Sequence, residues 1–186
     1  SAWMANDNLI IGDAGTGTLQ VTAAGEVTSG AVTLGAASGS SGGVTIDGDG
    51  SVVSVGGDVV IGENGAGTLL VTAGGTLNAA GSITLASETG SSGVLQIGDG
   101  AGSGSVTASS VAGGAGTATV IFDHTDLGYS FTPLITGTAS VQQTGSGTTI
   151  LASANSYSGG TTIEAGTLQA GAANVLSTAS AVTIAA

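Results

Sequence analysis

Residues Gly147–Leu168 read GTTILASANSYSGGTTIEAGTL, and this stretch decides how the rest of the chain is interpreted. Apolar Ile150, Ile163 and Leu168 stand among threonines, which is typical of short strands with one buried side. Between them, residues 155–160 (NSYSGG) predict a turn, because asparagine and glycine adopt positive φ at little cost. The stretch therefore predicts one coil of a stacked β structure.

An internal repeat lies upstream of this coil. The segment NLIIGDAGTGTLQVTAAGEV begins at Asn8, and the similar segment DVVIGENGAGTLLVTAGGTL begins at Asp58, fifty residues later. A period of this length is typical of a unit of two or three coils. We therefore expect internal repeats over about 8–57 and 58–107.

Each repeat unit has the spacing of β-strands. Leu19 and Val21 alternate with Thr18, Gln20 and Thr22, so one set of side chains is expected inside and the other outside. Such runs are three to five residues long, and turns rich in glycine, serine, asparagine and aspartate separate them. No window predicts a helix, since glycine is frequent and no apolar stripe recurs at helical spacing.

These features predict an all-β chain that forms a parallel β-helix. A sandwich does not require similar turns at the same place in each unit, whereas a solenoid stacks identical residues coil upon coil. At roughly 20 residues per coil we expect about nine coils, forming a single domain over residues 1–186. The glycine-rich composition leaves disorder as an alternative, but 41% of the residues are hydrophobic and alternate regularly, which disfavours it.

The stretch 147–168 closely resembles the passenger-associated repeat of bacterial autotransporters, and 120–145 resembles the coil that often precedes that repeat. The residues that carry the structural motif are Asn155, Tyr157, Gly159, Gly160, Thr161, Ile163, Gly166, Thr167 and Leu168. The resemblance implies a right-handed parallel β-helix outside the cell. It also implies a C-terminal outer-membrane β-barrel translocator in the same precursor.

The segment 118–141 departs from the regular pattern. It holds three of the five aromatic residues, the single histidine and the single proline: Phe122, Tyr129, Phe131, His124 and Pro133. We expect an irregular, larger coil with aromatic filling and a bent corner. A protruding lip that contacts a ligand is the alternative.

Composition excludes several functions. The chain has no lysine or arginine and a formal net charge of −12, which argues against nucleic-acid partners and anionic membrane surfaces. It has no cysteine, so disulfides, Cys–Zn sites and thiol catalysis are excluded. No signal peptide or membrane-spanning stretch is visible, and we expect an excised piece of a longer chain that does not insert into a membrane.

Candidate catalytic and metal-binding residues are few. His124 lies near Asp123 and Asp126, and we expect a turn histidine beside an acid rather than a catalytic pair. Asp47 and Asp49 are close enough in sequence to suggest a glycosidase pair, but two turn aspartates are the simpler interpretation. No catalytic, cofactor-binding or metal-binding residue is assigned, and the ligand-binding residues are unknown.

The turns and strands offer only weak signals for a calcium site or an ice-binding face. The segments 47–50 (DGDG) and 98–100 (GDG) only faintly resemble a calcium-binding β-roll, whose full nonapeptide is absent. An ice-binding face would require a long array of pairs such as Thr117 and Thr119, which the strands do not sustain.

The sequence thus favours an extracellular, surface-displayed adhesin passenger without enzymatic activity or cofactors. Its expected partners are a host surface protein or glycan, or the same passenger on another cell. The alternative is a passive β-helical stalk or export-folding scaffold that presents another domain. A secreted β-helical glycan-active enzyme and an ice-binding solenoid remain as distant alternatives.

Overall fold

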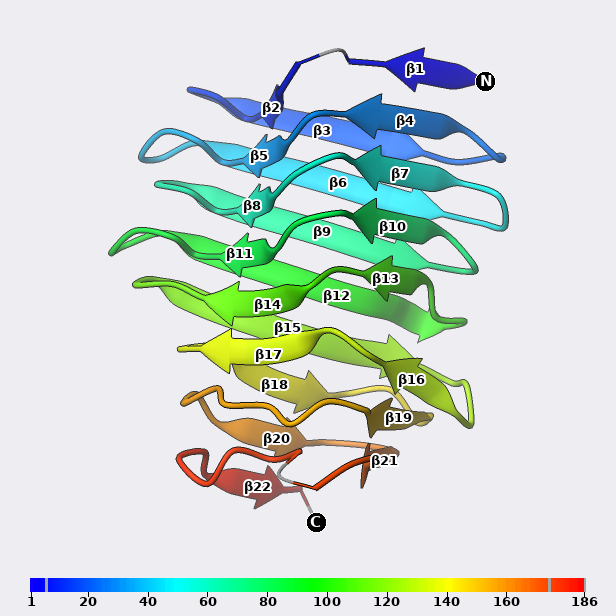
Figure 1. The fold of residues 1–186 in the computed structure, drawn as a ribbon, viewed down its shortest axis with the longest axis vertical. Helices are drawn as coiled ribbons and strands as arrows, with labels where there is room; N and C mark the ends of the chain where they lie inside the picture. The colour runs from blue at the N-terminus through cyan, green and yellow to red at the C-terminus, as the bar shows by residue number, and fades with distance from the viewer. Residues whose placement is uncertain (6, 174, 186) are drawn as a thin grey trace.

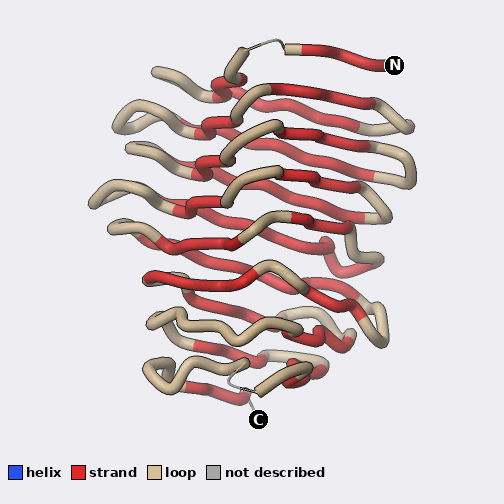
Figure 2. The backbone as a smooth tube through the Cα atoms, viewed as in Figure 1, coloured by secondary structure: helices blue, strands red, loops and turns tan. Residues whose placement is uncertain are grey.

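The computed structural model describes residues 1–5, 7–173 and 175–185. These residues form a stack of turns made of 22 short strands, and the described residues contain no helix. Figure 1 shows the turns lying one below another from the N-terminus to the C-terminus, and Figure 2 shows strands joined by short loops. Within the described part, no helix has the length and apolar character needed to cross a bilayer.

The strands belong to four parallel sheets. The first two sheets, of five and six strands, comprise β1 (Ala2–Met4), β4 (Glu26–Ser29), β7 (Val52–Val55), β10 (Thr76–Ala79) and β13 (Ser105–Thr107), then β2 (Leu9–Ile11), β5 (Val32–Leu34), β8 (Val59–Ile61), β11 (Ile83–Leu85), β14 (Ser110–Gly113) and β17 (Leu134–Gly137).

The other two sheets have eight and three strands. They comprise β3 (Thr16–Val21), β6 (Ser41–Asp47), β9 (Ala66–Thr72), β12 (Ser92–Ala101), β15 (Thr117–His124), β18 (Ser140–Gln143), β20 (Thr161–Ile163) and β22 (Val182–Ile184), then β16 (Tyr129–Phe131), β19 (Thr148–Leu151) and β21 (Thr167–Ala170).

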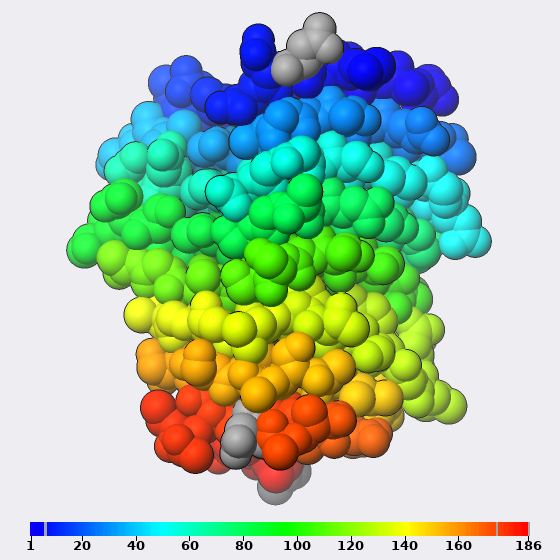
Figure 3. All heavy atoms as spheres, in the orientation of Figure 1, coloured from blue at the N-terminus to red at the C-terminus, as the bar shows by residue number. Residues whose placement is uncertain are grey.

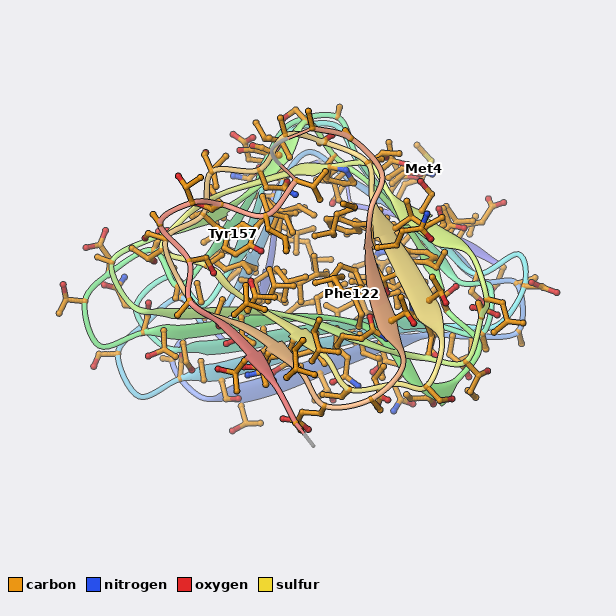
Figure 4. The ribbon with its side chains drawn as sticks, turned by 90° about the horizontal axis from the view of Figure 1, so that it is seen from below. Met4, Phe122 and Tyr157 are labelled. Atoms are coloured by element: carbon orange, nitrogen blue, oxygen red, sulfur yellow. The ribbon has the colours of Figure 1, made fainter. Side chains whose placement is uncertain are left out.

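The chain is a right-handed parallel β-helix, as the resemblance of residues 147–168 to the passenger-associated repeat implied. Successive strands belong to successive sheets, and each strand pairs in parallel with the strand one turn away. In Figure 1 the chain runs leftward on the near side and rightward on the far side while it descends, which is the right-handed sense. Figure 4 looks along the stack and shows a three-sided outline whose longest side is the eight-stranded sheet. Each layer in Figure 3 is a continuous piece of sequence.

The prediction of roughly nine coils is wrong, because the eight strands of the largest sheet define about seven turns. In the first half Val21 pairs with Ile46. Beyond the middle, Phe122 pairs with Gln143 and Gln143 with Ile163, so the chain returns to the same column after fewer residues. The expected coil length therefore holds only at the C-terminal end. The turns of the first half are longer because strands such as β9 and β12, with 7 and 10 residues, are longer than β20 and β22, with 3 each.

Columns of apolar side chains fill the interior. One column of the eight-stranded sheet consists of Leu19, Val44, Leu69, Leu95, Val120 and Val141, which are paired in register. Leu95 and Val120 are completely buried, and burial of an aliphatic side chain of this size stabilises the fold by about 2 kcal/mol. Parallel in-register pairing thus converts the alternation of the sequence into one continuous core.

The segment 118–141 brings aromatic rings into this core. Phe122 and Phe131 are buried, with ring centroids 5.1 Å apart in an edge-to-face arrangement. Figure 4 shows Phe122 inside the outline of the stack. The expected larger coil is not found, since the turn from Phe122 to Gln143 is shorter than the turn from Val21 to Ile46. Aromatic rings occupy the space that aliphatic columns fill elsewhere.

A column of glycines lets the chain enter the eight-stranded sheet. Gly17, Gly42, Gly67 and Gly93 are paired in register at the start of four successive strands. A Cβ atom at Gly67 would lie 2.2 Å from the backbone nitrogen of Gly62, at the corner that precedes it. The recurring glycine is therefore a steric requirement of the corner.

We expect Gly67→Ala to destabilise the protein by about 3 kcal/mol, because neither backbone can move away without breaking the stack. Gly15→Ala is the matched control, since a Cβ there meets nothing within 4 Å, and its effect should stay within about 0.5 kcal/mol. Urea titrations followed by circular dichroism measure both. Equal stability of the two variants would show that the corner can relax.

Candidate functional site

The motif residues at the C-terminal end surround an arc that has no strand. The six-stranded sheet ends at β17, and residues 152–160 take its place in the next turn without forming a strand. Asn155 lies in this arc, and its side chain is 6% exposed. Its Oδ1 accepts a hydrogen bond from the Ile135 backbone N–H at 2.8 Å, and its Nδ2 donates to the Val175 carbonyl at 2.9 Å. One amide therefore joins three successive turns, beside the backbone hydrogen bonds that the Ser156 and Ser158 N–H groups donate to the Ile135 and Gly137 carbonyls.

Tyr157 anchors the same arc to the core. Its ring is completely buried, and Figure 4 shows it inside the outline of the stack. Its Oη lies 2.7 Å from Oγ1 of Thr161, which is 3.1 Å from Oγ of Ser180 in the next turn. Burial raises the pKa of Tyr157, while the hydrogen bonds to Thr161 and Ser180 act in the opposite direction. The hydroxyl therefore stays neutral and satisfied inside the protein.

Two motif glycines have a steric explanation. A Cβ at Gly159 would lie 2.4 Å from the Ala139 carbonyl oxygen, and Gly166 has a φ of +63° and approaches the Gly147 carbonyl oxygen. Gly160 has no such contact, and nothing in the structure explains why it must be glycine.

The other three motif residues lie at the strands. Ile163 pairs with Gln143 and Ile184, while Thr167 and Leu168 belong to β21 and pair with β19. The structure therefore places the motif residues 155–160 in the arc, Thr161 and Ile163 in β20, and the rest at the start of β21. Their role as a structural motif stays a prediction.

We expect Asn155→Ala to cost about 4 kcal/mol in the free energy of unfolding, because it leaves the buried Ile135 N–H and Val175 carbonyl without their partner. Asn64→Ala is the matched control: Asn64 is exposed and donates one hydrogen bond to the Ala36 carbonyl, so a loss below about 1 kcal/mol is expected. Chemical denaturation of both purified variants gives the comparison. A similar small loss at both sites would mean that water replaces the Asn155 amide.

A second polar centre lies around His124. The sequence predicts a turn histidine, but His124 is the last residue of β15 and its side chain is completely buried. Its Nε2 lies 2.8 Å from Oγ1 of Thr149, which donates to Oε1 of Gln143 at 2.7 Å. The Gln143 Nε2 in turn donates to the Gly145 carbonyl at 2.9 Å. Side chains alternate inward and outward along β18, which places Gln143 inside, and this alternation is visible in the sequence.

This chain of hydrogen bonds determines the tautomer of His124. Because the Thr149 hydroxyl gives its proton to Gln143, Thr149 must accept a proton from Nε2 of the imidazole. The Nδ1 atom of the neutral ring is then the unprotonated nitrogen, and it has no hydrogen-bond partner among the described residues. It lies 4.0 Å from Oδ2 of Asp126, whose side chain is 46% exposed. Hydrogen bonds from Ser103 lower the pKa of Asp126, so this carboxylate is ionised.

Asp126, His124 and Thr149 follow the order acid, imidazole, hydroxyl that is found in nucleophilic catalysis. The Thr149 hydroxyl is completely buried in the core and has already donated its proton to Gln143. It therefore cannot reach an external substrate in this conformation. Asp123, the third residue considered with this pair, lies next to His124 in β15 and is half-exposed.

The pattern G-x-S-x-G occurs over residues 39–43. The mechanism behind this pattern requires a serine on a sharp turn between a strand and a helix. Ser41 instead begins the strand β6 and pairs with Thr16 and Ala66 on either side. The local context is therefore that of a regular solenoid strand.

The aspartates of the turns are dispersed. Asp47 ends β6, Asp49 lies exposed in the next turn, and Asp99 accepts a hydrogen bond from Thr72 at 2.9 Å. Over residues 1–5, 7–173 and 175–185, no three acidic, histidine or cysteine side chains come together in a group able to hold a metal ion.

The outer faces of the sheets carry mostly uncharged side chains, polar ones with a few aliphatic ones among them. On the eight-stranded sheet one outward column consists of Gln20, Thr45, Leu70, Gln96, Ile121 and Gln142. On the five-stranded sheet Thr28, Ser54, Asn78 and Thr107 are paired in register beside a shallow groove of about 410 Å³. Large exposed apolar side chains of the described residues cluster at the two ends, at Trp3, Met4, Ile10, Val182 and Ile184, with Leu127 in a loop.

Comparison with known proteins gives two matches. Residues 141–170 match the family described as Passenger-associated-transport-repeat. The Adhesin BmaC autotransporter of Brucella suis biovar 1 (strain 1330) is 39% identical over 66 residues. This alignment covers 36% of the chain and 2% of the relative, so the chain spans a very small part of the relative that it matches. No solved structure matches the chain.

Proposed function

From the premise that this chain is an autotransporter passenger segment with a passenger-associated repeat, we propose that it is part of a surface-displayed adhesin. The match of residues 141–170, within a right-handed β-helix, carries the proposal. The adhesin name of the similar protein supports the same role. The precursor would also contain an outer-membrane translocator, and the rod would act outside the cell.

The proposed role is attachment without catalysis. The acid, imidazole and hydroxyl groups at Asp126, His124 and Thr149 serve the core, since the hydroxyl is buried and already hydrogen-bonded. With a net charge of −12 and no basic side chain, the rod repels anionic ligands. The partner would be a host surface protein or a neutral glycan, or the same passenger on a neighbouring cell. Contacts would come from the hydroxyl and amide groups of the outer sheet faces.

A passive stalk is the second candidate. Strong protein interfaces concentrate Trp, Tyr and Arg, whereas the tyrosines here are half-buried or buried and the tryptophan lies at the N-terminal end of the stack. The outward columns of the middle turns carry threonine, serine, glutamine and aliphatic residues such as Leu70. Such a surface favours many weak contacts or none.

Charged substitutions on the outer faces distinguish the two roles. We expect Thr68→Glu with Gln96→Glu on the eight-stranded sheet, or Thr28→Glu with Asn78→Glu on the five-stranded sheet, to lower adhesion of displaying bacteria about tenfold. Neither pair removes a core side chain, so export should continue, and an antibody against a distal epitope checks this. Binding to host cells and matrix and mixing of two labelled bacterial populations are the readouts. Full adhesion by both variants and by a deletion of residues 1–186 would leave the stalk as the function.

The repeat would also assist export if turn-by-turn folding outside the cell prevents backsliding. We expect Gln169→Pro to lower surface display about tenfold, because proline removes a backbone donor from β21, where Gln169 pairs with Ile150. The Gln169 side chain is exposed, so Gln169→Ala is a control that keeps the backbone donor. Flow cytometry with the distal antibody measures display. Normal display of the proline variant would show that export does not depend on the folding of β21.

A further inference from the structure

His124 lies where the solenoid changes its construction. Before it, one turn carries the chain from Ile97 to Phe122, whereas the following turns, from Phe122 to Gln143 and from Gln143 to Ile163, are shorter. The core changes at the same place: buried Ile97 and Phe122 on one side are followed by the buried, polar Gln143 in the same column. The imidazole is therefore part of the junction between an aliphatic stack and a more polar one.

The side-chain hydrogen bonds of His124 all lead to the C-terminal side. Its Nε2 contacts Thr149 of β19, and Thr149 contacts Gln143 of β18. The ring also packs against Tyr129 of β16, with centroids 5.1 Å apart. Toward the preceding turn the connection is made by the backbone, where Thr125 N–H donates to the Ala101 carbonyl at 2.8 Å. A change at the imidazole therefore acts first on the turns that follow.

The surroundings of the imidazole oppose a positive charge. Burial lowers the pKa of His124, while the carboxylates of Asp126 and Asp123 and a hydrogen bond to the Asp126 backbone together raise it by a smaller amount. From β16 the facing titratable group is Tyr129, whose pKa is raised by burial and which stays neutral, and β18 and β19 contribute the neutral Gln143 and Thr149. On β12, Asp99 is hydrogen-bonded to Thr72 of another turn. The chain has no lysine or arginine whose positive charge could affect the protonation of His124.

A second proton on the ring would have one weak acceptor close by, the backbone carbonyl of Asp126, whose effect on the pKa of His124 is smaller than that of burial. That proton would belong to Nδ1, which has no hydrogen-bond partner among the described residues and is 4.0 Å from Asp126 Oδ2. That distance is too long for a hydrogen bond, so the loop after β15 would have to move before the carboxylate could accept the proton. Burial outweighs this acceptor, so a buried imidazolium destabilises the conformation that encloses it.

We propose that His124 is an acid-sensitive latch, whose protonation opens the turns beyond β15 while the longer turns before it stay folded. In a solenoid each turn is stabilised by its neighbours, so weakening one junction uncouples the two parts. The C-terminal part is also the weaker one, because strands of the large sheet shrink from 10 residues in β12 to 3 in β20 and β22. Opening therefore proceeds toward the C-terminus.

The direction of the pH dependence follows from which form of the protein binds the extra proton. The folded pKa of His124 lies below its value in the opened chain, about 6.5, so the opened form binds the extra proton. The contribution of neutral His124 to the stability of these turns is fully present above about pH 6.5, and it decreases as the pH falls below that value. The opening equilibrium should rise by up to about tenfold per pH unit until the folded pKa is reached. Between pH 5 and 7 His124 is the one side chain with an ordinary pKa in this range.

The test uses the 186-residue chain in hydrogen-exchange mass spectrometry from pH 7.5 to 5, corrected for the intrinsic exchange rate. We expect protection to fall with pH in peptides from 129–170 and to stay constant in peptides from 26–97. In His124→Gln, an amide that can still donate to Thr149, this pH dependence should disappear. The single histidine also gives one imidazole signal by nuclear magnetic resonance, and it should titrate below its ordinary pKa.

A second variant keeps the proposal testable if the His124→Gln protein fails to fold. Asp126→Asn keeps an acceptor for the Ser103 N–H and removes the carboxylate that favours the protonated ring. It should therefore extend the acid-sensitive range to lower pH, whereas Asp49→Asn, an exposed turn residue, should behave as wild type. The proposal is overturned if the imidazole titrates at or above its ordinary pKa, if His124→Gln keeps the wild-type pH dependence, or if both parts open together.

Discussion

The hydrogen bonds between successive turns are the constraint on which the rest of this structure depends. Every strand pairs in parallel with the strand one turn away, so each residue lies above and below residues of the same position in the coil. The inward columns are therefore mostly apolar, other columns point outward, and corner positions such as Gly42 and Gly67 require glycine. The fold therefore needs few large side chains, which agrees with an aromatic content of 3%.

The C-terminal turns meet the same constraint in another way. Where the six-stranded sheet stops, the Asn155 amide adds hydrogen bonds to the turns on both sides, and Tyr157 fills the interior. Gln143, Thr149 and Thr161 place polar groups where aliphatic columns stood before, and each has a partner. The residues matched by the passenger-associated repeat thus include substitutes for missing sheet. Satisfied polar networks of this kind specify one arrangement, and they fail when a single member loses its partner.

The distribution of charge affects how such a rod could be used. Eight of the twelve acids lie outside the described strands, and the outward columns in the middle of the large sheet are uncharged. Acidic turns without any basic residue keep the rod soluble and leave its flat faces neutral. Recognition by a hydroxyl- and amide-rich face relies on many weak hydrogen bonds, and repetition along the rod can add them together.

The sequence by itself determined the class of fold, because period-two alternation, dense glycine turns and a fifty-residue repeat permit little besides a stacked β structure. The resemblance of residues 147–168 to the passenger-associated repeat was also visible in the sequence and agrees with the family match over 141–170. Only the tertiary structure decided the number of turns, since local patterns do not reveal which residues are paired across a full turn. It alone showed that His124 is buried and joined to Thr149, a partner in the later strand β19. The local sequence pattern determines whether a side chain points inward or outward. Which residues it meets in the adjacent turns depends on how many residues the chain needs to return to the same face.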